Sequence, residues 1–210
     1  MNQELFDSIC RGRKNDVEKL VNEMVAENVD IEEILMKSMV PAMRDIGEKF
    51  ARNEVYVPEM LIAARAMQAG LDILDPLLTN SGHKPIATVA IATVKGDLHD
   101  IGKNLVAMML KGAGFEVVDL GVDCSVEKFQ DAVDNKGATV VMLSALLTTT
   151  MSYMKTVAEH FASNDNVKVF IGGAPITQQY SDEIGADGYS GDAHGAVLLV
   201  ESKLGVSKSA

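Results

Sequence analysis

The hydrophobic pattern of this chain changes its period once, near residue 80, and that change limits the possible folds more than any other feature. Before it, apolar residues return every three or four positions and strong helix formers dominate. We therefore expect helices over residues 2–10, 13–27, 31–52 and 57–79, which together predict a four-helix bundle. Pro58 suits the first turn of the last helix, whereas Pro76 is expected to kink that helix or end it early.

After the change, short apolar runs rich in β-branched residues alternate with helical patterns. The expected strands are 86–93, 116–120, 138–144, 167–171 and 187–190, and the expected helices are 100–113, 125–136, 149–163, 176–184 and 192–203. The run 140–143 is apolar at every position, which is typical of parallel strands that helices cover on both faces. The expected fold is α/β, with the helical bundle followed by a flavodoxin-like, Rossmann-type doubly wound sheet of five parallel strands.

A polar stretch with glycine and proline, residues 79–85, separates the two patterns, and we expect it to be a linker. The predicted domains are therefore a helical domain with this linker, residues 1–84, and an α/β domain, residues 85–210.

Charge, cysteine content and hydropathy exclude several classes of protein. The formal net charge is −11 and the pI is near 4.8, so the basic surface that nucleic acid requires is not expected. Cys10 and Cys124 are far apart in the sequence, which predicts reduced thiols rather than a disulfide or a thiolate metal site. The chain begins without a signal-peptide pattern, and no apolar run approaches the ~20 residues of a membrane span. We therefore expect a cytoplasmic protein with neither nucleic acid nor membrane as partner.

Distinctive residues follow three of the expected strands. Gly96–Gly102 follow the first strand, Ser144 and Leu146 stand at the end of the third, and Gly172-Gly173 follow the fourth. Because ligands of such sheets bind beyond the carboxyl ends of the strands, we expect these residues to converge on one edge. A carboxylate two residues before His99 can hydrogen-bond one ring nitrogen and strengthen the other as a metal ligand. Glycines at this edge are expected to leave a slot for a flat or threaded group.

Two other kinds of site share part of this pattern. A phosphate-binding P-loop needs four residues between its glycines and Ser or Thr after the lysine, whereas five residues separate Gly96 from Gly102 and Asn104 follows Lys103. We therefore expect Lys103 to be a solvated residue early in a helix. A metal phosphohydrolase would need a larger set of histidine and acidic ligands than is visible. The other histidines, His83, His160 and His194, are expected to be ordinary surface or packing residues.

Taken together, Asp97-x-His99-x-x-Gly102, Ser144-x-Leu146 and Gly172-Gly173 resemble the cobalamin-binding module of methionine synthase. They resemble still more closely the small corrinoid proteins of anaerobic methyltransferase systems, of the methylamine or quaternary-amine type, over nearly the whole chain. The resemblance implies one cobalamin or related corrinoid per chain. It also implies that His99 is the cobalt ligand in place of the cofactor's benzimidazole, whose arm threads into the α/β domain.

The resemblance implies further roles. Ser144 and Thr148 would line the channel of the displaced arm, and Thr150 takes the place of a serine that forms a relay with the aspartate and histidine. Phe50 and Val57 would cover the methyl-bearing face of the corrin from a helical cap formed by the bundle. The expected cofactor-binding residues are Gly96, Asp97, Leu98, His99, Asp100, Ile101, Gly102, Ser144, Leu146, Thr148, Thr150, Gly172, Gly173, Ala193, Phe50 and Val57.

The function implied is that of a methyl carrier without catalytic residues of its own. A substrate-specific methyltransferase, for a methylated or quaternary amine, would load the cobalt, and a second methyltransferase would pass the methyl group to a thiol or tetrahydropterin. A reductive activase is a further expected partner. A cobalamin-responsive sensor or regulator is an alternative, but a separate output domain is not visible. The small subunit of a cobalamin-dependent mutase is another, although the long N-terminal helical region argues against it.

Overall fold

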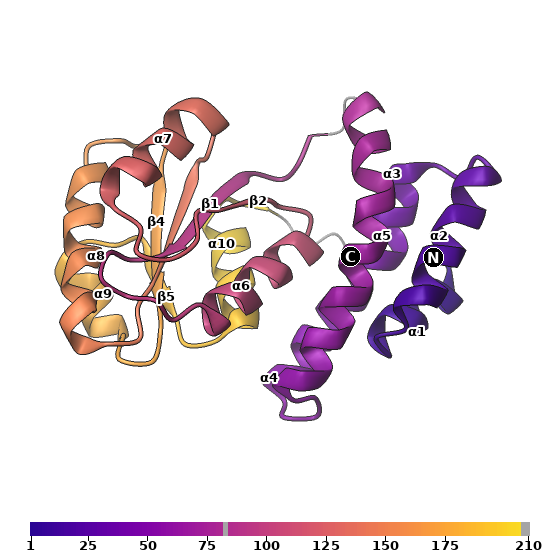
Figure 1. Ribbon diagram of the computed structural model, residues 1–210, viewed down its shortest axis with the longest axis horizontal. Helices are drawn as coiled ribbons and strands as arrows, with labels where there is room; N and C mark the ends of the chain where they lie inside the picture. Colours follow the sequence, from indigo (N-terminus) through magenta and orange to yellow (C-terminus); the bar gives the residue numbers. More distant parts are fainter. Residues whose placement is uncertain (82–83, 207–210) are drawn as a thin grey trace. The chain divides into compact units, whose positions relative to one another are not determined.

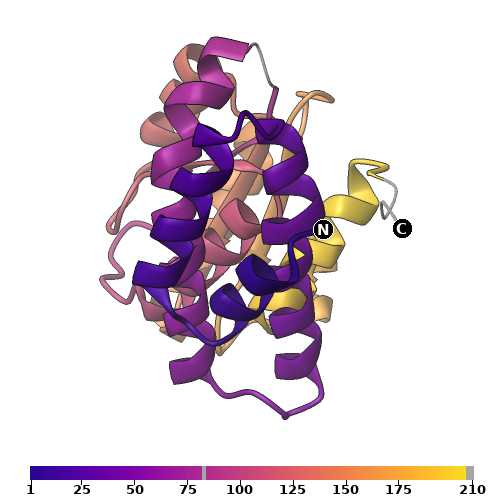
Figure 2. The same ribbon diagram turned by 90° about the vertical axis from the view of Figure 1, so that its right-hand side faces the viewer.

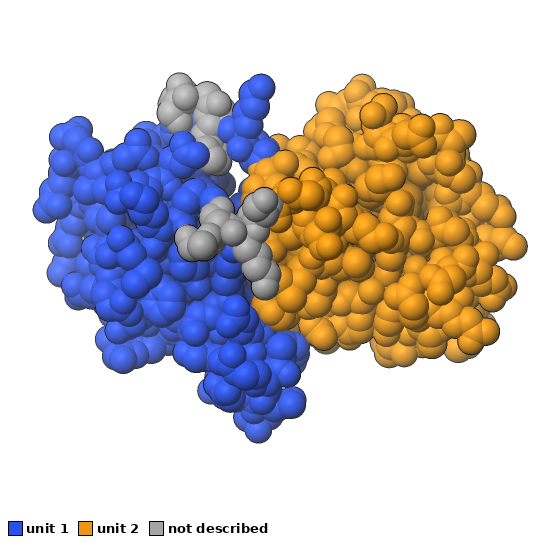
Figure 3. Space-filling model, turned by 180° about the vertical axis from the view of Figure 1, so that it is seen from behind, with its two compact units in different colours: residues 1–85, 108–114 blue, residues 86–107, 115–210 orange. Residues whose placement is uncertain are grey.

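The structure is a computed structural model that describes residues 1–81 and 84–206 (Figure 1). The chain divides into two compact units (Figure 3). Unit 1 comprises Met1–Pro85 and Met108–Gly114, and unit 2 comprises Ile86–Ala107 and Phe115–Ala210. Of the expected linker, Gly82 and His83 lie outside the described residues, and so does the expectation for His83.

Unit 1 is helical, as predicted. Its helices are α1 (Gln3–Cys10), α2 (Lys14–Ala26), α3 (Ile31–Ile34), α4 (Val40–Ala51) and α5 (Val57–Ser81), with a π-helical turn over Leu35–Met39 that joins α3 to α4. These helices lie side by side (Figure 2). Helix α2 packs along α5, and α1 packs on α2, α4 and α5. Leu5, Val17, Met39, Met60 and Met67 are buried in the core between them.

The π-helical turn explains how the helix continues through a proline. Proline inside a helix lacks an N–H donor, and its ring collides with the carbonyl of the residue four positions back. Just before Pro41, the N–H of Val40 bonds instead to the carbonyl of Leu35, five residues back. This wider turn accommodates Pro41, so the expected helix 31–52 is one run with a local change of pitch.

Pro76 does not end its helix early, which was one of the two effects expected of it. Helix α5 continues through Pro76 to Ser81, so that part of the prediction is wrong. Leu74 and Leu78 are buried on either side of the proline. Their packing holds the helix in place and outweighs the lost hydrogen bond.

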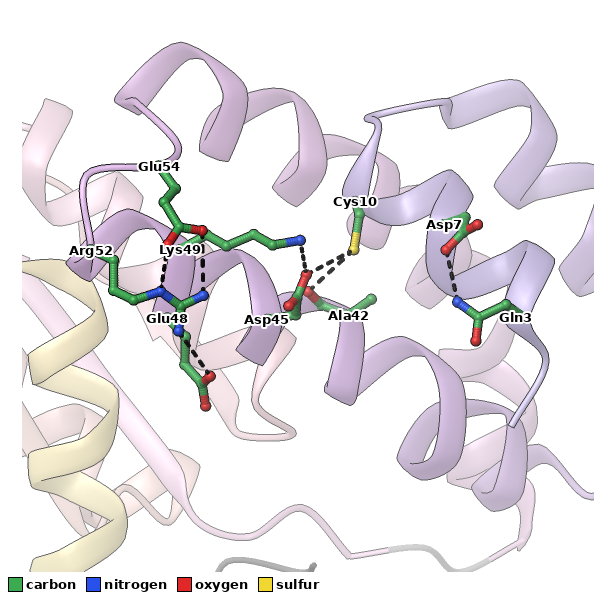
Figure 4. Close-up of polar contacts among 9 residues, drawn as sticks. All are labelled: Gln3, Asp7, Cys10, Ala42, Asp45, Glu48, Lys49, Arg52 and Glu54. Atoms are coloured by element: carbon green, nitrogen blue, oxygen red, sulfur yellow. Dashed lines mark hydrogen bonds and ion pairs between the residues drawn. The ribbon is translucent and has the colours of Figure 1, made fainter.

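A polar cluster ties α1 to α4. The thiol of Cys10 lies 3.7 Å from both the Ala42 carbonyl and the Asp45 carboxylate, and Lys49 donates to Asp45 at 2.6 Å. Figure 4 shows the thiol and the ammonium group converging on Asp45. Burial and the neighbouring carboxylate raise the pKa of the Cys10 thiol to about 11. Cys10 and Cys124 are both free thiols, as predicted.

Unit 2 is a doubly wound α/β fold. Its strands are β1 (Thr88–Thr93), β2 (Glu116–Asp119), β3 (Val140–Ser144), β4 (Lys168–Gly172) and β5 (Gly188–Ser190). Its helices are α6 (Ile101–Gly112), whose residues from Met108 onward are counted with unit 1, α7 (Val126–Lys136), α8 (Thr148–Phe161), α9 (Gln178–Ile184) and α10 (Ala193–Lys203). All strand pairs are parallel and the order is β2-β1-β3-β4-β5, which confirms the flavodoxin-like prediction.

The two faces of the sheet are both covered. Helices α7, α8 and α9 lie on one face, and α6 and α10 on the other (Figure 1). Phe129 and Met154 pack on the first face among the alternate strand residues Ala92, Leu143 and Ile171. Burial on both faces explains why the strands are apolar at nearly every position.

The register of the sheet brings the strand ends together. Thr93 pairs with Ser144, Ser144 with Gly172, and Gly172 with Ser190. The loops that carry the three motifs therefore start from one edge, where ligands of this fold class bind. Among the described residues, no helix is both apolar and long enough to cross a bilayer.

Candidate functional site

The centre of the site is a buried carboxylate in the loop after β1. Asp97 is fully buried. Its Oδ2 accepts hydrogen bonds from the Thr150 hydroxyl at 2.7 Å and from the backbone N–H of Leu146 at 2.8 Å and Leu147 at 3.3 Å. Its Oδ1 accepts from the His99 backbone N–H at 3.0 Å. Donors from the loop before α8 and from the first turn of that helix thus hold one side chain of the β1–α6 loop.

These donors keep the carboxylate ionised. Burial by itself raises the pKa of Asp97, but the hydrogen bonds from the His99 backbone, the Thr150 hydroxyl and the Leu146 backbone outweigh it. The net result is a pKa well below the ordinary value for aspartate, because each donor stabilises the charged form. Asp97 is therefore a fixed anion at neutral pH.

The imidazole of His99 is oriented by this anion. Its Nδ1 lies 2.7 Å from Asp97 Oδ1, and its side chain is 51% exposed. The Thr93 hydroxyl donates to the His99 carbonyl at 2.7 Å, which fixes the backbone as well. Because an anion faces Nδ1, the proton is favoured there, and Nε2 is the nitrogen available to a metal.

The glycines of the motifs fall into two groups. A Cβ atom on Gly173, whose φ is +126°, would lie 1.9 Å from the Ala145 carbonyl oxygen, and one on Gly172 would lie 3.1 Å from the Ser190 carbonyl oxygen. The close approach of the chain to itself requires glycine at position 173 and makes any Cβ atom at position 172 tight. Gly102 is different, because a Cβ atom there would have no atom of the protein within 4 Å. Glycine in a helix costs roughly 0.5–1 kcal/mol relative to alanine, and no contact within the protein requires glycine at the start of α6.

A metal held here would need ligands from elsewhere. In the part of the chain that the structure describes, no group of three or more His, Cys, Asp or Glu side chains could hold an ion. One oriented imidazole with an open space beside it instead fits a metal whose remaining ligands come from a macrocycle.

Both parts of the chain match family models. Residues 87–198 match the model described as B12 binding domain, and residues 1–75 match a second model with the same description. The chain belongs to the B12-binding family.

Relatives of this B12-binding chain agree over nearly its full length. The trimethylamine corrinoid protein of Methanosarcina barkeri is 41% identical, over 90% of this chain and 89% of its own. The dimethylamine corrinoid protein of the same organism is 39% identical, over 96% of each chain. These matches confirm the predicted resemblance to corrinoid proteins of methyltransferase systems.

Solved structures confirm the B12-binding fold. The methanol:cobalamin methyltransferase complex of Methanosarcina barkeri contains a chain with a TM-score of 0.84 and 25% identity, covering 97% of this chain and 79% of that one. A cobalamin-binding protein from Desulfitobacterium hafniense gives a TM-score of 0.76 at 28% identity, covering 94% of this chain and 96% of that one.

Most residues expected at the site lie at the carboxyl edge of the sheet. Those in unit 2 are Gly96, Asp97, Leu98, His99, Asp100, Ile101, Gly102, Ser144, Leu146, Thr148, Thr150, Gly172, Gly173 and Ala193. The large apolar side chains of Leu98 and Ile101 are 71% and 77% exposed. Phe50 and Val57 belong to unit 1, where Phe50 is half-buried near the end of α4 and Val57 is exposed at the start of α5.

One sequence prediction at the site is wrong. Lys103 is not solvated but buried, with 2% of its side chain exposed, and its Nζ contacts both Asp119 oxygens at 2.6 and 2.5 Å. The aliphatic stem of lysine packs among apolar neighbours when the ammonium group has a partner. This ion pair ties the first turn of α6 to the end of β2.

Sequence reasoning also missed three residues around Asp97. Leu147 donates its backbone N–H, Thr93 holds the His99 carbonyl, and Asp123 contacts the backbone of the loop. Of these three, only Thr93 could have been found from the sequence. It is the last residue of a buried strand, and a buried polar side chain needs a hydrogen-bond partner.

Proposed function

We propose that this protein carries one cobalamin-type corrinoid per chain and moves methyl groups between two methyltransferases, with His99 Nε2 as the cobalt ligand. The observation that carries the proposal is the buried, ionised Asp97, which orients the half-exposed imidazole of His99. When bound, the cobalt supplies the nucleophile that accepts a methyl group and later releases it. The chain itself supplies the ligand, the hydrogen bonds that orient it and the exclusion of water.

The neighbouring loops support binding of the cofactor's displaced arm. We assign Ser144, Thr148 and Ala193 to its surroundings, because they stand at the carboxyl ends of β3 and β5 beside the two strand-end glycines. Thr150 acts through Asp97, since its hydroxyl donates to the carboxylate at 2.7 Å. Gly102 leaves room for the corrin beside His99.

The names of the relatives support a methylated amine as the methyl donor. Two of them are named as trimethylamine and dimethylamine corrinoid proteins and cover about nine-tenths or more of this chain. We assign a methylated amine as the donor, delivered by a substrate-specific methyltransferase, and a thiol or tetrahydropterin as the acceptor. A structural neighbour lies within a methyltransferase complex, which supports docking to such a partner. A reductive activase would restore the cofactor after oxidation, and a cytoplasmic location follows from these partners.

In unit 1, Phe50 and Val57 are proposed to shield the methyl-bearing face of the corrin. Their apolar side chains are partly exposed, so they offer surface for contact with a flat apolar ligand. Among the carrier, sensor and mutase-subunit alternatives, the names of the relatives favour the carrier.

The decisive experiment is pulsed EPR of the Co(II) state after reconstitution with hydroxocobalamin. We expect about one corrinoid per chain and hyperfine coupling to an imidazole nitrogen, lost in His99→Ala and weakened in Asp97→Asn. Loss of such an orienting partner lowers metal affinity or activity by ~10–100-fold. His160→Ala is the matched control, because His160 is exposed, hydrogen-bonds to Gln130 and packs edge-on against the ring of Phe161. Benzimidazole coupling in the wild type, or an unchanged imidazole signal in His99→Ala, would refute the ligand assignment.

A further inference from the structure

The loop between β2 and α7 runs along the loop that carries His99. The N–H of Thr93 donates to the Gly121 carbonyl and the N–H of Cys124 donates to the Thr93 carbonyl, both at 3.0 Å. Val94 and Cys124 also form a parallel bridge. The β2–α7 loop thus continues the sheet pairing just beyond the strand ends, beside the site.

Asp123 in this loop contacts two consecutive residues of the His99 loop. Its Oδ1 accepts from the Gly96 N–H at 2.8 Å, and its own N–H donates to the Asp97 carbonyl at 3.0 Å. To make both contacts it adopts a φ of +49°, a conformation that aspartate tolerates better than most residues. One residue therefore serves as acceptor and donor to the two peptide units that flank the Gly96–Asp97 peptide.

The first of these peptide units lies within the turn that presents Asp97, and the second directly follows that turn. The Asp97 N–H donates to the Val94 carbonyl at 3.1 Å, and Gly96, at φ +85°, occupies the third position of this turn. A positive φ at that position is what a type II turn requires. Asp123 binds the Gly96 N–H within the turn and the Asp97 carbonyl that leaves it. Hydrogen bonds consequently fix both the N–H and the carbonyl of Asp97, the residue whose carboxylate contacts His99.

We propose that Asp123 is a positioning residue, which holds the Asp97–His99 pair in its geometry and thereby sets how strongly His99 ligates cobalt. This deepens the proposed function and rests on it where cobalt is concerned. Asp123 is exposed and hydrogen-bonds to backbone atoms of the His99 loop, so its effect is transmitted through the turn rather than by direct contact with the imidazole. The hydrogen bond, rather than the negative charge, is the active element.

Three variants separate these effects. Asp123→Gly keeps the positive φ but removes the acceptor, whereas Asp123→Asn keeps both an oxygen acceptor and tolerance of that φ while removing the charge. Asn28→Gly is the matched control, because Asn28 has φ +58° and lies after α2 in unit 1. Urea unfolding of each variant shows that the proteins compared are folded.

The first measurement uses the cofactor-free protein and reads the His99 ring nitrogens by NMR at pH 9. In the wild type the Nδ1–H tautomer should predominate, because Asp97 faces Nδ1. Asp123→Gly should lower the ratio of Nδ1–H to Nε2–H tautomer by about 2- to 10-fold, the range that one hydrogen bond contributes. Asp123→Asn should restore the ratio, and Asn28→Gly should leave it unchanged.

The second measurement is the ratio of histidine-bound to histidine-free Co(II) by EPR in the reconstituted protein, which should fall by the same factor. If Asp123→Gly equals Asn28→Gly in both measurements, or if Asp123→Asn fails to restore them, the positioning role is refuted. If the tautomer ratio shifts but the wild type never shows imidazole on cobalt, Asp123 positions the pair and the proposed ligation fails instead.

Discussion

The oxygen atoms of Asp97 combine contacts from three segments of the chain. Oδ1 faces His99 within its own loop, and Oδ2 accepts from Leu146, Leu147 and Thr150 in and before α8. Because the ionised form is stabilised by these donors, the side chain can be fully buried without a cation beside it. Because a buried charge without hydrogen-bond partners costs free energy, the loss of any single donor should lower the stability of the fold.

Thr150 provides the cleanest test of that sensitivity. Thr150→Val keeps the shape of the side chain but removes the O–H that donates to Asp97 at 2.7 Å. We expect a loss of about 1.5–3 kcal/mol in the free energy of unfolding, the range for hydrogen bonds to charged groups. Urea unfolding of the cofactor-free protein measures it. Thr150→Ser retains the hydroxyl and should lose much less, and equal losses in the two variants would show that packing, not the hydrogen bond, matters.

At this scale the sequence predicted the Asp97, His99 and Thr150 relay better than the contacts that hold it in place. The relay of Asp97, His99 and Thr150 was expected from the family resemblance, and the structure brings the three together. Lys103 was misassigned because nothing local distinguishes a buried lysine from a solvated one; its partner Asp119 is 16 residues away. Asp123 was missed for the same reason, since its role depends on how two loops lie side by side.

Among the elements, the strand ends and helix starts do most to shape the site. Gly172 and Gly173 close β4 against neighbouring backbone, whereas Gly102 opens α6 toward empty space. Glycines that cannot be told apart in the sequence thus differ in their surroundings: one kind is crowded by backbone and the other is not.

Two alanine variants should separate these causes. Gly173→Ala places a Cβ atom against the Ala145 carbonyl at a φ of +126°, so we expect a loss of about 3 kcal/mol or more in unfolding free energy. Gly102→Ala should instead leave stability unchanged or raise it by up to about 1 kcal/mol, because alanine favours the helix. The same variant should bind hydroxocobalamin more weakly. Unfolding in urea and a corrinoid titration check both, and unimpaired binding by Gly102→Ala would argue against approach of the ligand at this glycine.

Element positions were largely predictable, because a buried parallel strand and an amphipathic helix have distinct periods. The strand and helix bounds in unit 2 agree with the predicted ranges to within about two residues. The π-helical turn before Pro41 and the continuation of α5 through Pro76 were not predictable, because both depend on tertiary packing that outweighs local preference.

For the whole molecule, the two thiols give a dependence of stability on pH. Burial raises the pKa of both Cys10 and Cys124 to about 11, and an unfolded thiol titrates near 8.5. The contribution of the protonated thiols to the free energy of unfolding is therefore complete below about pH 8.5. It is lost as the pH rises toward 11. We expect the urea midpoint of the wild type to fall more steeply between pH 8.5 and 11 than that of Cys124→Ala. Parallel curves would show that the thiol does not titrate in this range.

The proposed shielding role of unit 1 can be tested by photolysis of the methylated cofactor. Phe50→Ala should leave the imidazole signal on cobalt intact but speed photolysis of the methylated cofactor, because a methyl radical that is less enclosed escapes more often. Photolysis rates of wild type and variant under equal illumination provide the comparison. Phe6→Ala, in α1 of the same unit, controls for the loss of an aromatic side chain. Identical rates for the wild type and Phe50→Ala would remove Phe50 from this role.

The span of the Asp97 contacts also has a consequence in time. The partners of this carboxylate follow it by 49 residues at Leu146 and 53 at Thr150. At the usual rates of synthesis, roughly 3–10 s pass between the addition of Asp97 and that of Thr150 to a growing chain. During that interval the ligand loop exists without the donors that hold it. A nascent chain therefore has His99 before it has the donors that hold Asp97, and we expect any loading of a cofactor at this loop to follow the emergence of β3 and the start of α8 from the ribosome.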